Sequence, residues 1–287
     1  MAVYKRTYKG YAGALTSEWS RFLVIPRFAW RGLLSQKFIT IFYALCFFYP
    51  LGCAVAIYLN NNLGFLGQYM PVPKNGLFEV GGRFFWIYTN VQGAFAFILT
   101  AFIGPGLISP DLSNGALPLY FCRPFSRFEY VSGKMMVLLG ALSNITWIPG
   151  LLLFGLQSGI AEPGWFSKNL WLAGSIFLSS MVWIVLICVL SLALSAWVRW
   201  RIVAGALMLV VFFLLAGMAQ AINAVMRTDN GYWLDPATNI ERVSMVLFGM
   251  DLPDEVSTGE SIVCLIVLSA FCIWLLSKKV RAFEVVR

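Results

Sequence analysis

Residues able to carry out catalysis or bind a metal are scarce in this chain, and their absence excludes several functions. The 287 residues include no histidine, which removes Ser-His and Cys-His catalysis and the commonest haem and metal ligands. The six cysteines show no CxxC spacing and no phosphate-binding GxxxxGK[ST] loop occurs, so metal and nucleotide sites are not indicated. We therefore predict that the chain is not an enzyme and has no cofactor or metal of its own.

The polar segment 108–134, ISPDLSNGALPLYFCRPFSRFEYVSGK, lies between two long apolar stretches. It contains leucines, aromatic residues and two arginines, and its Gly and Pro residues are typical of turns. Pro105 and Pro110 are expected to break the preceding helix. Asp111 or Ser113 is then expected to cap a new short helix.

The elements that position this segment are membrane helices. Apolar residues make up 60% of the chain and charged residues 12%, against roughly 45–50% and 25% in soluble domains. The apolar residues form blocks of about 20, the length of a helix that crosses a hydrocarbon core. They predict an all-α membrane protein with six transmembrane helices and no cleaved signal peptide. The predicted spans, in one domain of residues 38–277, are 38–59, 85–108, 135–157, 171–198, 202–226 and 256–277.

Lys and Arg set the predicted orientation, because they are enriched in cytoplasmic loops. With the N- and C-termini both cytoplasmic, 16 of the 21 Lys and Arg residues lie on the cytoplasmic side, and six of the 13 acidic residues lie in the outer loop 227–255. The net charge of +8 is spread over four loops beside spans. This distribution indicates membrane orientation and not a nucleic-acid-binding surface.

Segments outside the spans are also patterned. Residues 1–37 form a cytoplasmic N-terminal segment that predicts an interfacial amphipathic helix bent near Pro26, with an unstructured polybasic lead-in as the alternative. In the outer loop, Val243–Met250 is too short to span. It is expected as a re-entrant or interfacial helix, or equally as an amphipathic cap on the bundle. Residues 278–287 form a basic cytoplasmic tail.

The loop and the overall plan resemble the permease (membrane) subunits of type-2 ATP-binding-cassette (ABC) transporters. In that family the loop has an acidic residue, a Gly-Thr-Leu, a Pro-x-Ser-Arg and a Gly-Lys. The matching residues here are Asp111, Asn114-Gly115-Ala116-Leu117, Pro124, Ser126, Arg127, Gly133 and Lys134. The family usually has Glu at the place of Asp111 and often Thr at that of Ala116. The motif covers about 25 residues, and RFAWRGLLSQKF before the first span is similar as well.

This resemblance implies that residues 109–134 form a coupling loop with a short cytoplasmic coupling helix that docks on a separate cytosolic ATPase subunit. ATP and magnesium would bind to that partner, and two permeases, as a homodimer or heterodimer, would enclose a translocation path. The implied setting is the inner membrane of a prokaryote, with export as the expected direction. The implied docking residues are Asp111, Gly115, Leu117, Tyr120, Arg123, Pro124, Arg127 and Lys134.

Polar residues within the spans suggest a translocation path, and small residues suggest a dimer seam. Membrane helices turn polar groups toward partners or a cavity, and amides are costly to hide. Small residues let two helices approach closely, so the fifth span is a candidate dimer seam, with packing inside the subunit as the alternative. The path candidates are Asn90, Gln92 and Asn144, and the seam candidates are Gly205, Ala216 and Gly217.

Two other classes of function stay open. The composition fits a non-transporting membrane anchor or assembly subunit of a larger complex equally well. A gradient-driven carrier is less favoured, because no Asp, Glu, Lys or Arg lies in the interior of a predicted span. Membrane lipid is an expected contact in each case.

Overall fold

The computed structural model describes residues 23–62, 78–121, 126–227, 230–252 and 257–280. Regular structure in these ranges is entirely helical, with no strand among them. Six segments are long and apolar enough to cross a membrane. The prediction of an all-α chain with six membrane-length helical segments is therefore confirmed.

Three of these segments are pairs of helices that meet at a turn, and three are single helices. In chain order they are α2 (Lys37–Leu45) with α3 (Phe48–Asn61), α5 (Gly82–Ile103) with α6 (Pro105–Ser113), α8 (Arg127–Ile145) with α9 (Trp147–Ile160), α10 (Trp165–Trp197), α11 (Arg201–Met226) and α13 (Thr258–Lys279). The shorter elements are α1 (Val24–Leu34), α7 (Leu117–Phe121), the 3-10 helix η2 (Asn230–Leu234) and α12 (Pro236–Leu247).

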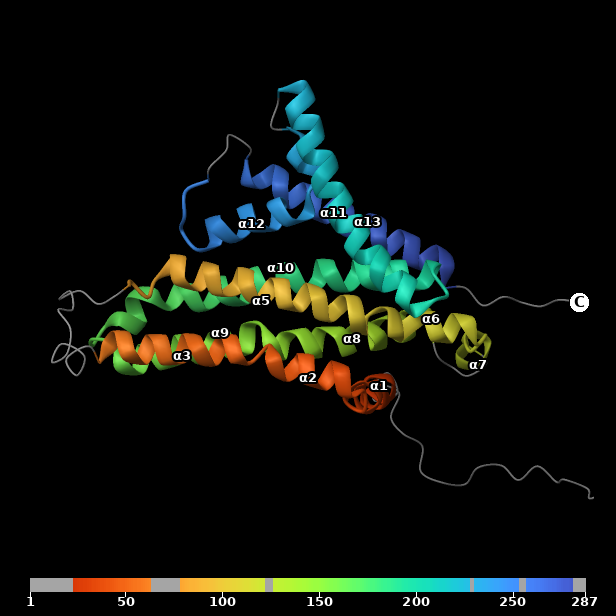
Figure 1. Ribbon diagram of the computed structural model, residues 1–287, viewed down its shortest axis with the longest axis horizontal. Helices are drawn as coiled ribbons and strands as arrows, with labels where there is room; N and C mark the ends of the chain where they lie inside the picture. The colour runs from red at the N-terminus through yellow and green to blue at the C-terminus, as the bar shows by residue number, and fades with distance from the viewer. Residues whose placement is uncertain (1–22, 63–77, 122–125, 228–229, 253–256, 281–287) are drawn as a thin grey trace, which may run out of the picture.

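The central helix of the fold is α10 (Figure 1). It packs against α5, α6, α8, α9, α11, α12 and α13. Because its neighbours are apolar on every side, α10 has no polar face. The helix α11 diverges from the bundle toward the top of Figure 1, with α12 above α10 on the left of α11, and α13 crossing α11.

The two ends of the bundle differ in charge. One end holds the α6–α7 turn, α1, the start of α8 and the end of α13 (Figure 1). We call it the basic end, since its described cations are Arg27, Arg31, Lys37, Arg127, Lys134, Arg199, Arg201, Lys278 and Lys279. The loops that the predicted orientation assigns to the cytoplasm thus meet at one end of the molecule.

A buried amide ties the first three membrane-length segments together. Pro50 and Pro149 lack the N–H that would bond to the carbonyl four residues earlier, so the carbonyls of Cys46 and Ile145 lose their helical partners. The side chain of Gln92 on α5 replaces both: its Nε2 donates to Cys46 O at 3.2 Å and to Ile145 O. Gln92 is fully buried, and it therefore connects α5 to the turns α2–α3 and α8–α9.

The predicted helix break occurs at Gly104–Pro105, where α5 ends and α6 begins, but not at Pro110. Gly104 keeps helical angles (φ −57°, ψ −47°), and α6 starts directly after it. Pro105 is the first residue of α6, where a missing N–H costs little, and Pro110 lies inside α6. The second segment consequently continues to Ser113 instead of ending near residue 108.

The N-terminal helix α1 is the described part of the predicted interfacial segment, and residues 1–22 lie outside the described ranges. Pro26 lies in the first turn of α1, where proline is tolerated, so the predicted bend there is absent from the described helix. Trp30 packs on α8 against Gly140, while Phe28 is exposed. The helix thus has one side on the bundle and an apolar residue on the outside.

The helix of the outer loop begins earlier than the sequence pattern predicts. It starts at Pro236, and Asp235 is its N-cap, with a carboxylate oxygen 3.0 Å from the backbone N of Ala237. Proline at the first helical position and Asp at the cap are a common helix start. The predicted segment Val243–Met250 therefore overlaps only the second half of α12, which ends at Leu247.

Contacts along α10 define the direction of α12. Ser175 bonds to the carbonyl of Leu247, and one turn further Ser179 bonds to Ser244 at 2.7 Å. Further along α10, Leu186 packs in one cluster with Ile240 of α12. The helix α12 thus runs antiparallel beside α10 (Figure 1), starting deep in the bundle and ending near the start of α10.

A test of the buried amide compares two α5 residues of the same chemistry. We expect Gln92→Leu to lower the thermal midpoint of the purified chain, since each orphaned carbonyl costs about 1–3 kcal/mol. Asn90→Leu is the control, because the Asn90 amide bonds only to Trp86 O of its own helix. Adding Pro50→Ala and Pro149→Ala to Gln92→Leu should recover stability, since both carbonyls regain backbone donors. Equal midpoints for the two Leu variants would contradict this role of Gln92.

Candidate functional site

The turn between α6 and α7 is built around Gly115. The N–H of Ala116 bonds to Asp111 O at 2.8 Å and that of Gly115 bonds to Leu112 O at 3.4 Å, which is the Schellman pattern of a helix end. Gly115 has φ +63°, a left-handed conformation that favours glycine. The sequence predicted that Asp111 or Ser113 would cap a new helix. Neither residue does so, because both lie in the last turn of α6.

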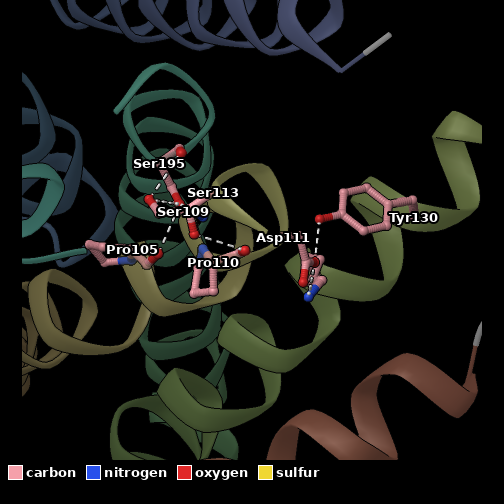
Figure 2. A network of polar contacts seen from close by, with 8 residues as sticks. Pro105, Ser109, Pro110, Asp111, Ser113, Tyr130 and Ser195 are labelled. Atoms are coloured by element: carbon pink, nitrogen blue, oxygen red, sulfur yellow. Dashed lines mark hydrogen bonds and ion pairs between the residues drawn. The ribbon is translucent and has the colours of Figure 1, made fainter. Parts of the chain in front are cut away.

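A charged cluster fixes α6 to α8 at the basic end (Figure 2). Asp111 forms an ion pair with Lys134, with 2.8 Å between Oδ2 and Nζ, and accepts a 2.7 Å hydrogen bond from the Tyr130 hydroxyl. The Lys134 ammonium also lies 5.4 Å from the centre of the Tyr130 ring. Lys134 is only 8% exposed, so it depends on these partners for the stabilisation that water would otherwise give.

A second set of hydrogen bonds fixes the other side of α6 to α10. Figure 2 shows Ser109 facing Ser195, opposite to the Asp111–Tyr130 contact. The Ser195 hydroxyl accepts from the backbone N–H of Ser109 at 3.0 Å and donates to Pro105 O at 3.1 Å, and the Ser109 hydroxyl donates to Val198 O at 2.7 Å. The end of the second membrane-length segment is thus held from two sides.

The third segment begins with a complete capping box. The Ser126 hydroxyl accepts from Glu129 N at 3.1 Å, and the Glu129 carboxylate accepts from Ser126 N at 2.6 Å. Arg127 and Phe128, the first residues of α8, are exposed, Phe128 by 80%. The predicted docking residues Arg123 and Pro124 lie outside the described residues.

The short helix α7 has a buried and an exposed side. Leu117 is buried, and the Tyr120 ring packs on Tyr130 with centroids 5.3 Å apart. Burial, with the nearby Asp111 charge, raises the pKa of Tyr120, so its phenol stays neutral. Leu119 is 71% exposed on the other side.

Arg201, at the start of α11, links the same region to the N-terminal helices. Its guanidinium donates to Gln36 Oε1 at 2.9 Å and to Phe102 O at 3.2 Å. The guanidinium also lies against Gly106 of α6, where an added Cβ would be 3.1 Å from Nε. The α6–α7 turn therefore belongs to one braced assembly with the α1–α2 junction and α11.

The structure brings three of the eight predicted docking residues together but separates the predicted path residues. Asp111, Tyr120 and Lys134 surround Tyr130, as described above. Gln92 instead lies in the amide link between three segments, Asn90 bonds to its own helix, and Asn144 is exposed on α8. These three residues therefore have separate surroundings in the described structure.

The three predicted seam residues also differ in their surroundings. Gly205 is buried, and a Cβ there would be 2.5 Å from the carbonyl oxygen of Ala101 on α5. Pro105 leaves that carbonyl without a helical partner, which lets α11 approach it. Ala216 is half-buried, and an added Cβ on the exposed Gly217 would have no atom within 4 Å. Gly205 therefore packs inside the subunit, while Gly217 lies on an open face.

Sequence reasoning missed the polar residues that α12 carries into the bundle. Arg242 is 2% exposed, with its guanidinium 4.9 Å from the Tyr232 ring centre, and Asp235 and Asn239 are also buried. The lack of charged residues was noted only for the six predicted spans, and α12 is not one of them. The Asp235-Pro236 pair was the available signal, since it marks a helix start.

No protein-family model matches the chain, and no curated protein matches it. Among the described residues, no group of three His, Cys, Asp or Glu side chains could hold a metal ion. The distinctive feature of the arrangement around Asp111 is its geometry. That geometry is a turn held rigidly at its base with exposed apolar and cationic side chains at its tip.

We expect the two charged residues of the cluster, Asp111 and Lys134, to contribute unequally to the stability of the fold. Asp111→Asn should lower the free energy of unfolding by about 1–3 kcal/mol. This is less than the roughly 3–5 kcal/mol lost when a fully buried ion pair is broken, because the Asp111 side chain is 18% exposed. Lys134→Met should cost less, since Asp111 keeps the Tyr130 hydroxyl. Chemical unfolding in mild detergent, with the double variant included, measures both effects. Strictly additive losses would show that the two charges do not interact.

Proposed function

We propose that this chain is the membrane-spanning permease subunit of a transporter driven by a separate cytosolic ATPase. One observation carries the proposal: the α6–α7 turn and the start of α8 form a protrusion that is braced at its base and exposed at its tip. The base is held by Asp111–Lys134 and by Ser109–Ser195. The tip presents Leu119, Phe128 and Arg127.

Such a protrusion suits the transmission of force. A push on α7 reaches α6 through a tight turn, α8 through the ion pair, and α10 through the serine pair. Packed elements move as units and do not deform continuously, so a displacement at the tip becomes a displacement of whole helices. A non-transporting anchor subunit needs attachment but no such bracing.

The proposed orientation places the basic end in the cytoplasm of a prokaryotic cell, with both termini inside. The enrichment of Lys and Arg at that end supports this, because cytoplasmic loops retain positive charge. The helix α1 then lies along the inner leaflet, with Phe28 toward the acyl chains. Its Arg27 and Arg31 can reach lipid phosphates.

The proposed complex contains two permease chains and an ATPase that binds ATP and magnesium. The open face of α11 around Gly217 is the proposed site for the second permease. Export is the proposed direction, and the proposed substrate is apolar or amphipathic, because the membrane-length segments are strongly apolar. The alternative, an anchor or assembly subunit, predicts a complex that lacks any nucleotide-binding protein.

The docking role predicts that variants at the tip lose the ATPase partner. Leu119→Glu and Arg127→Glu should reduce co-purification of a nucleotide-binding subunit about tenfold or more, as expected at a binding hot spot. Gly115→Pro should act similarly, because proline cannot adopt φ +63°. Pull-down in mild detergent with an ATPase assay measures this.

The matched control is Phe166→Glu, an exposed aromatic position at the opposite end of the bundle, which should leave the partner bound. Unchanged ATPase stimulation by Arg127→Glu would refute the docking assignment. A stable complex without any nucleotide-binding protein would favour the anchor alternative.

The orientation predicts which added cysteines react from outside. In a Cys122→Ala background, Ser167→Cys should react with a membrane-impermeant maleimide in intact cells, whereas Asn114→Cys should react only after permeabilisation. Both positions are exposed, at opposite ends of the bundle, so accessibility depends on the membrane alone. The reverse labelling pattern would invert the proposed topology.

A further inference from the structure

A cavity of about 400 Å³ lies between α11, η2, α12 and α13, away from the α6–α7 turn. This volume is at the lower end of the range for ligand pockets, roughly 300–1,000 Å³. Its wall is formed mainly by apolar side chains, and Asn239 contributes an amide. The wall residues used below are Leu215, Trp233, Asn239, Cys264, Leu268 and Phe271.

The short helix η2, which forms one side of this cavity, is fixed to its three neighbours. The N–H of Gly231 donates to Asn223 Oδ1 on α11 at 2.7 Å. The indole N–H of Trp233 donates to Glu260 on α13 at 3.3 Å. Asn239 on α12 donates to the carbonyl of Tyr232 at 2.9 Å. The cavity is thus a built feature of the fold and not a gap between loosely placed helices.

Asn239 supplies a buried acceptor whose orientation is fixed. Its Nδ2 lies within hydrogen-bond distance of three carbonyl oxygens, those of Tyr232, Trp233 and Asp235. A flipped amide would set oxygen against those oxygens, so Oδ1 must point the other way. Asn239 is 1% exposed, and its Oδ1 has no hydrogen-bond partner among the described residues. An acceptor buried in this way is costly unless a donor reaches it.

The position of the cavity indicates an occupant from the bilayer. Its α13 wall residues begin roughly 8 Å and end roughly 20 Å along that helix from Thr258, at 1.5 Å per residue. This places the cavity beside the outer half of an apolar, membrane-length helix. Trp233 and Phe271 are about half-exposed at its rim, so an apolar chain can enter without crossing water.

We propose that this cavity binds a single-chain aliphatic amphiphile whose hydroxyl head group donates a hydrogen bond to Asn239 Oδ1. A fatty alcohol and a monoacylglycerol share this chemistry. The apolar walls hold the chain, and the carbonyl of Asn239 selects the donor. The proposal is independent of the ATP-driven function, because none of these residues belongs to the α6–α7 turn or its braces.

A second hollow provides an internal comparison. A groove of about 520 Å³ lies on the other side of α13, where α10 and α12 meet it. Its wall, which includes Met181, Val185, Ile266 and Ala270, is apolar apart from Ser269. It offers space for a chain without a buried amide acceptor. Binding there should depend on chain length and not on a hydroxyl group.

The experiment uses the full chain in phosphatidylcholine nanodiscs and a dodecanol that carries an aliphatic diazirine near its methyl end. After illumination, mass spectrometry should find the label on residues of η2 and α12 and on the residues of α13 that line the cavity. Competition by 1-dodecanol or 1-monolaurin should be about tenfold stronger than competition by 1-methoxydodecane, which has no donor. Stronger competition by 1-dodecanol would identify a fatty alcohol as the ligand, and stronger competition by 1-monolaurin would identify a monoacylglycerol.

Three variants separate the cavity from the groove and from general destabilisation. Asn239→Leu should remove the preference for alcohol over ether. Cys264→Phe should abolish cavity labelling by filling space, without touching the amide contacts. Ala270→Phe, on the groove side of α13, should leave cavity labelling intact. Equal competition by alcohol and ether in the wild-type chain, or equal effects of the two Phe variants, would overturn the proposal.

Discussion

The structure depends on the rule that backbone carbonyls inside a membrane must find donors within the protein. Pro50 and Pro149 each remove one donor, and the single side chain of Gln92 supplies both replacements. Because the two carbonyls belong to different segments, satisfying them fixes the relative positions of three segments at once.

The α6–α7 turn extends this principle to the basic end of the bundle. The chain there leaves the apolar interior, so charges and hydroxyl groups replace apolar packing as the means of attachment. Asp111 and Lys134 join α6 to α8, while Ser109 and Ser195 join it to α10. The tip of the turn stays exposed because the polar contacts lie at its base. Rigidity and accessibility are thereby combined in a few residues.

The sequence predicted what depends on local composition. Blocks of about 20 apolar residues were sufficient to identify six membrane-length segments. It failed where a residue has more than one role: Pro110 lies inside a helix instead of breaking it, and Gln92 bonds to carbonyls that its sequence neighbours do not reveal. Asn239 and Arg242 were missed because α12 is short, polar and packed beside helices far away in the sequence.

The side-chain amide of Gln92, which donates to two carbonyls, also has a consequence for biosynthesis. One of its acceptors, Cys46 O, precedes it in the chain, whereas the other, Ile145 O, is made 53 residues later. Spans that leave the ribosome in order can form the first contact early but not the second. Until the third segment enters the membrane, the nascent chain therefore carries a donor that faces hydrocarbon. This temporary polar mark distinguishes an unfinished molecule from a finished one.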